Sequence, residues 1–144
     1  MTPQALADRQ HIQDLLVRYC HALDERDWPG FHALFTADAR LDFRAFGGPA
    51  GSAAELADYL AGVLASMRGC QHTISTSRVD LDGDEARVRT AAQVMMVSAG
   101  PQGQDHVLFA GLWYRDHLVR SPGGWRIRQR TQEYAWTHNL PPSA

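Results

Sequence analysis

The sequence predicts an α+β fold in which a curved antiparallel sheet carries N-terminal helices packed on its concave face. Helical periodicity is confined to the first half of the chain, and alternating strand patterns separated by short turns fill the second half. Several of these strands are apolar on both faces over part of their length, which indicates a sheet that is covered on both sides. The chain has 144 residues, 44% of them hydrophobic, so we expect a single domain over residues 1–144.

Three helices are expected before the strands begin. The first covers about residues 3–23, where apolar side chains recur every three or four positions. The second is short, with Asp27 as its N-cap and Pro29 in its first turn. Ser52 and Glu55 have the spacing of a capping box, which predicts the start of a third helix.

The strands are predicted from alternation and from turn residues. Residues 36–38 indicate a break, and 41–45 alternate as a short strand. Asp82 and Gly83 form a hairpin turn signal between the first two long strands. The four long strands are expected at His72–Leu81, Glu85–Val97, His106–Arg120 and Trp125–Trp136. The tail that contains Pro141 and Pro142 is expected to be irregular.

Composition excludes several classes of function. The net charge is −2 and the basic residues are spread along the chain, which argues against nucleic-acid binding. No apolar run approaches the length of a membrane span, so we expect no membrane insertion and a cytoplasmic location. Cys20 and Cys70 lack zinc-type spacing and are expected to be reduced. The remaining histidines show no ligand spacing and no phosphate-binding loop is present, so neither a metal nor another cofactor is expected.

Three segments resemble one known group of proteins. Residues 19–28 (YCHALDERDW), 70–74 (CQHTI) and 124–127 (GWRI) are similar to the SnoaL-like families, whose superfamily shares the cone-shaped α+β barrel of nuclear transport factor 2. The resemblance covers nearly the whole chain and implies that fold. It does not imply one activity, because the superfamily includes dehydratases, a dehydrochlorinase, isomerases, cyclases and non-catalytic oxygenase subunits.

Within this group the pattern is nearest to scytalone dehydratase and hexachlorocyclohexane dehydrochlorinase. The resemblance implies a catalytic pair formed by Asp24, at the end of the first helix, and His72, at the start of the sheet. A carboxylate beside one ring nitrogen fixes the tautomer and stabilises the protonated imidazole. The other nitrogen can then take a proton from a substrate. Without the resemblance, His72 would be read as a satisfied core histidine.

The polar residues that hold substrate in scytalone dehydratase have no counterparts here. The corresponding positions hold Leu23, Phe43, Met95 or Met96, Leu108 and Ala110. The resemblance therefore implies a small, largely apolar cyclic ligand rather than scytalone itself.

Seven residues are the candidates for contact with that ligand. They are Tyr19, Trp28, Phe43, Tyr59, Met95, Leu108 and Trp113. The aromatic members could equally be packed in the core. Trp113 and Tyr114 lie on opposite faces of a strand, so only one of them can point inward. Arg120 is expected to pair with Asp116, four positions earlier on the same face.

These observations favour a cofactor-independent lyase or isomerase, dehydratase-like, that uses Asp24 and His72 as a general base. Two alternatives remain open. One is a non-catalytic ligand-binding protein that resembles the oxygenase small subunits, and the other is a polyketide cyclase. The apolar outer strand faces also favour a homo-oligomer, and the resemblance implies a dimer or trimer.

Overall fold

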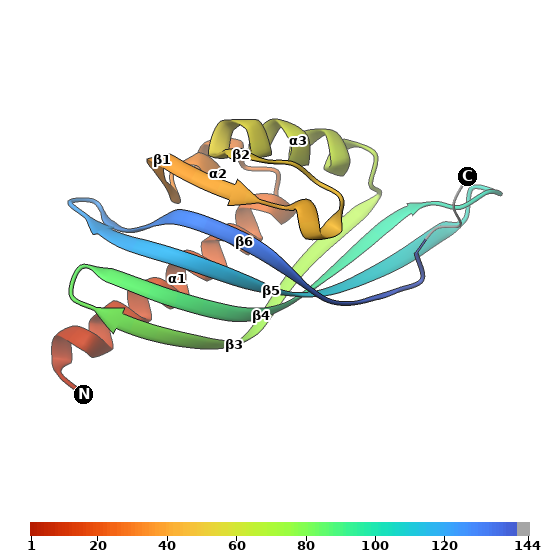
Figure 1. Cartoon of the computed structure of the whole chain (residues 1–144). Helices are drawn as coiled ribbons and strands as arrows, with labels where there is room; N and C mark the ends of the chain where they lie inside the picture. Colours follow the sequence, from red (N-terminus) through yellow and green to blue (C-terminus); the bar gives the residue numbers. More distant parts are fainter. Residues whose placement is uncertain (141–144) are drawn as a thin grey trace.

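The structure is a computed structural model that describes residues 1–140 (Figure 1). The helices are α1 (Pro3–Asp24), α2 (Trp28–His32) and α3 (Ala53–Ala65), with a short 3₁₀ turn at Arg44–Phe46. The strands are β1 (Phe35–Asp42), β2 (Ala50–Ser52), β3 (Gly69–Asp82), β4 (Glu85–Ala99), β5 (Asp105–Ser121) and β6 (Gly124–His138). The irregular tail expected at Pro141 and Pro142 lies outside the described residues. Within the described part of the chain, no helix is both long and apolar enough to cross a membrane.

The six strands form one curved sheet in the order β2-β1-β6-β5-β4-β3. The expected α+β class is confirmed, with two corrections to the sheet. It is mixed rather than antiparallel, because β1 runs parallel to β6. It is also open, ending at β2 on one side and β3 on the other, so it is a curved sheet and not a closed barrel.

The break expected at residues 36–38 is wrong, because β1 passes through it. This strand pairs with residues almost ninety positions later, Arg40 with Gln129 and Leu41 with Arg130. Pairing over such a distance overrides a local turn signal, and the irregularity survives only as a register shift between Phe35 and Arg40. The strand expected to reach residue 45 ends at Asp42.

The predicted helix starts are confirmed. The Asp27 carboxylate accepts a hydrogen bond from the Gly30 backbone N–H at 3.0 Å. Ser52 and Glu55 make both bonds of the capping box, at 3.1 and 3.2 Å. The turn between β3 and β4 has Gly83 at φ +60°, the left-handed conformation that glycine adopts most readily.

Helix α1 lies across the concave face of the sheet, and α3 covers the end formed by β1 and β2 (Figure 1). The buried stripe of α1 carries the apolar side chains predicted from its periodicity, Ile12, Leu15, Leu16, Tyr19 and Leu23. The helix ends at Asp24, above the first residues of β3. This arrangement leaves the space between the end of α1, α3 and the sheet to be filled by side chains from all three.

The expected pair of Arg120 with Asp116 is wrong. Asp116 instead binds Arg130 on the neighbouring strand, through two hydrogen bonds of 2.8 Å. These two residues lie directly opposite each other across β5 and β6. Arg120 reaches the other way, to Asp8 of α1 and to Asp84.

Candidate active site

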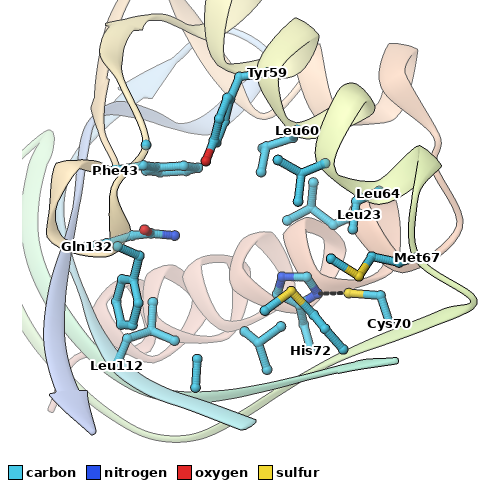
Figure 2. A pocket seen from close by; sticks show the side chains of 16 residues that line it. Leu23, Phe43, Tyr59, Leu60, Leu64, Met67, Cys70, His72, Leu112 and Gln132 are labelled. Carbon is cyan, nitrogen blue, oxygen red and sulfur yellow. Dashed lines mark hydrogen bonds between the residues drawn. The ribbon is translucent and has the colours of Figure 1, made fainter. Parts of the chain in front are cut away.

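A cavity of about 210 Å³ lies between the end of α1, α3 and the inner face of the sheet (Figure 2). Its wall is mostly aliphatic and aromatic. The side chains that line it belong to Leu23, Phe43, Phe46, Tyr59, Leu60, Val63, Leu64, Met67, Cys70, His72, Val94, Met96, Ala110, Leu112 and Gln132, and Gly48 completes the wall. A small cyclic molecule would therefore meet an apolar surface over most of its area.

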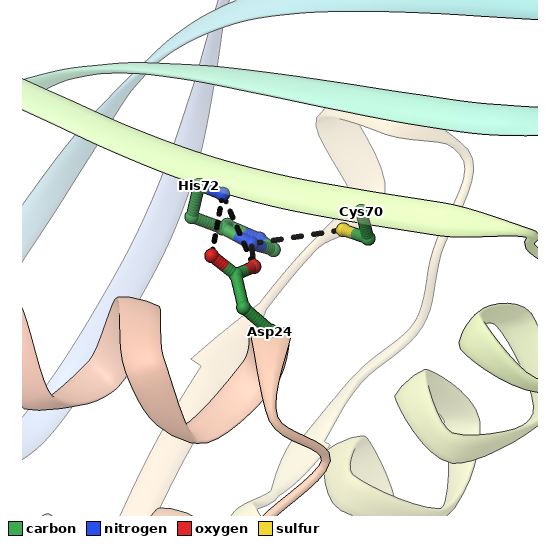
Figure 3. A group of neighbouring side chains, drawn as sticks. All are labelled: Asp24, Cys70 and His72. Atoms are coloured by element: carbon green, nitrogen blue, oxygen red, sulfur yellow. Dashed lines mark hydrogen bonds and ion pairs between the residues drawn. The ribbon is translucent and has the colours of Figure 1, made fainter.

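His72 lines one side of this cavity, and the Asp24 carboxylate meets its ring (Figure 3). The Asp24 Oδ1 atom is 2.7 Å from His72 Nδ1. The backbone N–H of His72 also donates to the Asp24 carboxylate, at 2.9 and 3.1 Å. The carboxylate is thus held by the same residue whose ring it orients.

The hydrogen-bond pattern assigns the ring nitrogens of His72. A carboxylate can only accept, so Nδ1 carries the proton that points to Asp24. In the neutral ring, Nε2 is then the unprotonated nitrogen, and the ring lines the cavity. The side chains of His72 and Asp24 are 9% and 23% exposed, so both lie largely away from bulk water, and of the two His72 lines the cavity.

Cys70 lies beside this pair, with its Sγ atom 3.8 Å from His72 Nδ1. Burial, together with the nearby negative charge of Asp24, raises the pKa of the Cys70 thiol to about 11. Both cysteines are free, as expected.

Asp24, Cys70 and His72 bring three possible metal ligands within 4.8 Å of one another. Two ligands of a tetrahedral zinc site, each about 2.0 Å from the metal, would lie about 3.3 Å apart. The Oδ1–Nδ1 distance is 2.7 Å, which fits a shared proton better than a shared metal.

The structure brings only some of the predicted ligand contacts to the cavity. Phe43 and Tyr59 line it. Tyr19 is buried behind it, with its ring edge-on to the His72 ring at a centroid distance of 6.5 Å. Trp28 packs against Phe31, away from the cavity.

The expected positions on the sheet need correction. Met96, not Met95, lines the cavity, since neighbouring residues of a strand point to opposite faces. Trp113 lies on the outer face beneath the Arg89 guanidinium, at 3.9 Å, while Tyr114 points inward and is buried. Leu108 is not among the lining residues, although Ala110 and Leu112 further along β5 are.

Gln132 is the polar lining residue that the sequence did not reveal. It comes from β6 and lies directly opposite Tyr114 of β5. An irregularity in the pairing of β5 and β6 between His117 and Leu118 shifts the alternation. Counting from Trp125 alone therefore could not place Gln132 on the inner face.

Comparison with known proteins defines the class of the protein. Residues 4–131 match the model of a SnoaL-like domain, and the chain belongs to this family. An uncharacterized protein of Mycobacterium tuberculosis is 41% identical over 127 residues, which cover 88% of this chain and 85% of that protein.

Solved structures agree on the fold. A scytalone dehydratase-like protein from Novosphingobium aromaticivorans superposes with a TM-score of 0.86 at 22% identity, covering 100% of this chain and 95% of that one. A type 2 hexachlorocyclohexane dehydrochlorinase superposes with a TM-score of 0.82 at 19% identity, covering 95% and 91%. At these identities the likeness shows a shared fold.

Proposed function

We propose that this protein is a cofactor-independent lyase or isomerase that removes a proton from a small, largely apolar cyclic molecule. The observation that carries the proposal is the 2.7 Å contact between Asp24 Oδ1 and His72 Nδ1 at the wall of an apolar cavity. It places a base with a fixed tautomer beside a space that suits an apolar ring.

The pair can supply general-base catalysis. Nε2 of His72 takes the proton of a substrate C–H or O–H group, and Asp24 stabilises the imidazolium that forms. The low polarity of the cavity strengthens this attraction. General-base assistance of this kind accelerates a reaction by roughly 10²–10⁴. Loss of a leaving group would complete a lyase reaction, and return of the proton to another carbon would complete an isomerisation.

The similar structures support a lyase within this class. By name, one is similar to a dehydratase and the other is a dehydrochlorinase, and both names denote an elimination. The apolar wall of the present cavity suits a hydrophobic cyclic substrate for such an elimination.

The test is turnover of a panel of hydrophobic cyclic alcohols, ketones and halides by the wild type, Asp24→Asn and His72→Gln. For a compound that the wild type converts, both variants should lose about 10²–10⁴ in rate while circular dichroism shows an unchanged fold. Full turnover by either folded variant would refute the proposal. A panel that binds and raises the melting temperature without conversion would favour a ligand-binding protein instead.

A further inference from the structure

Besides the Tyr59 hydroxyl on α3, the cavity wall is polar at two separated places. His72, with Cys70 beside it, comes from β3. Gln132 comes from β6, on the other side of the cavity in Figure 2, with its amide directed into the space. Strands β4 and β5 lie between these two strands, and they contribute aliphatic side chains such as Val94 and Leu112.

Within residues 1–140, no hydrogen bond joins the side-chain amide of Gln132 to another residue. Arg130, two positions earlier on the same strand, instead donates two hydrogen bonds to Asp116 through Nε and Nη2. A primary amide offers two N–H donors and one acceptor. Facing an apolar cavity, these groups cost free energy unless water or a ligand satisfies them.

We propose that Gln132 holds the carbonyl oxygen of the substrate, so that the substrate class is a small cyclic ketone whose acidic C–H faces His72. This inference rests on the proposed function, which requires only that His72 acts as a base. It adds the group that receives the negative charge. Removing a proton from carbon leaves an electron pair that is stabilised when it can move onto an oxygen held by a hydrogen-bond donor.

The proposed step balances without any further reactant. Nε2 of His72 takes the proton from the carbon next to the carbonyl, and the C–H electron pair forms a C=C bond. The carbonyl π pair moves to the oxygen, where the Gln132 N–H donates to the enolate. When the C=O bond re-forms, the C=C electrons either expel a β-hydroxyl group, which takes the proton from His72 and leaves as water, or, in a substrate with a further C=C bond conjugated to the enolate, take that proton at the far carbon of that bond.

The experiment compares two probes with the same carbon skeleton, 1-tetralone and tetralin, of which only the first has a carbonyl. Dissociation constants are measured by calorimetry, and exchange of the 1-tetralone C2 hydrogens with D₂O is followed by NMR. The variants are Gln132→Met, Gln132→Glu and His72→Gln. Gln93→Met on β4, at an exposed position, is the matched control.

Gln132→Met should weaken 1-tetralone binding about tenfold and leave tetralin binding unchanged, because only one hydrogen bond is lost. Exchange should fall by roughly 10²–10³, as for removal of an oxyanion donor. Gln132→Glu keeps the length of the side chain and, when ionised, has no donor. Measured at a pH where the new carboxyl is ionised, it should also lose the preference for 1-tetralone, which guards against a folding defect in the first variant. Gln93→Met should change nothing.

The two proposals fail in different ways. If the wild type does not prefer 1-tetralone over tetralin, or if both Gln132 variants keep wild-type affinity and exchange, the role of Gln132 is overturned, while loss of exchange in His72→Gln still supports the base. If His72→Gln keeps full exchange while the Gln132 variants lose the preference for 1-tetralone, the anchoring role stands and the proposed base is overturned.

Discussion

Two carboxylates in this molecule contact a basic side chain at nearly the same distance but in different surroundings. Asp24 lies 2.7 Å from His72, and Asp116 lies 2.8 Å from Arg130. The second pair is sealed, with side chains 0% and 1% exposed, whereas the histidine of the first pair lines the cavity.

The sealed pair serves the fold. The Arg130 guanidinium is stacked between the rings of Tyr19 and Tyr114, at 4.1 and 3.9 Å, so no substrate can reach it. An arginine in this position is permanently charged, so its side chain cannot release and take up a proton in turn. Histidine at the cavity can do so. A structural pair therefore differs from a candidate catalytic pair in its access to the cavity and in the partner of the carboxylate, and not in the length of the contact.

Neutralising each carboxylate in turn should give the largest difference in stability between the two pairs. Asp116→Asn should lower the free energy of unfolding by about 3–5 kcal/mol, because it leaves a buried, unpaired arginine. Asp24→Asn should lower it by only about 1 kcal/mol, because the amide oxygen can still accept from the His72 backbone. Urea denaturation measures both. Equal losses would contradict the distinction between the two pairs.

A double variant separates the effect of charge in the Asp116–Arg130 pair from the effect of packing. Asp116→Leu with Arg130→Met removes both charges, and it should recover most of the stability lost in Asp116→Asn, since the buried charge is gone. If the double variant is as unstable as the single one, the pair contributes through its packing and not through its charge balance.

Local signals in the sequence predicted the helix starts and the long hairpins well, because caps and turns depend on neighbouring residues. Asp27, the Ser52–Glu55 box and Gly83 all act where they were expected. The resemblance to known proteins supplied Asp24 and His72, which the structure brings into contact. Their role in catalysis stays a prediction.

The predictions that were wrong concern pairing between distant strands, or which residues of a strand face inward. Val94 and Met96 lie on the inner face of β4, whereas Met95, the candidate that the family resemblance suggests, does not line the cavity. The sequence holds no local signal that decides which of Trp113 and Tyr114 points inward, and in the structure it is Tyr114. The arginine that pairs with Asp116 comes from the adjacent strand, and only the register of β5 and β6 identifies it.

A third carboxylate extends the comparison to acid conditions. The Arg120 hydrogen bonds, with help from Trp125, hold the pKa of Asp8 well below its usual range despite burial. A depressed pKa stabilises the fold above the unfolded value of about 4, and the contribution is lost as the pH falls below it. Asp8→Asn should therefore cost about 2 kcal/mol at pH 7 and less as the pH is lowered from 4. Urea denaturation across pH 2–7 checks this, and a constant difference would contradict it.

The smallest expected effect is on the rate of Cys70 alkylation, which reports access to the cavity. Burial raises the pKa of Cys70 to about 11, so alkylation by iodoacetamide should be slow at pH 7 and rise about tenfold per pH unit towards that value. A ligand in the cavity should slow it further, because Cys70 lines the wall. Mass spectrometry measures the rate, with Cys70→Ala as control. Fast alkylation at pH 7 would show a cavity that is open to water.

We infer that Asp24 fixes the His72 tautomer and leaves Nε2 free towards the cavity. The most direct test is ¹⁵N NMR of the His72 ring in the wild type and in Asp24→Asn, at a pH where the ring is neutral. We expect a hydrogen-bonded Nδ1–H and an unprotonated Nε2 in the wild type, with this preference weakened in the variant. A wild-type ring protonated at Nε2, or a tautomer unchanged by Asp24→Asn, would contradict the account.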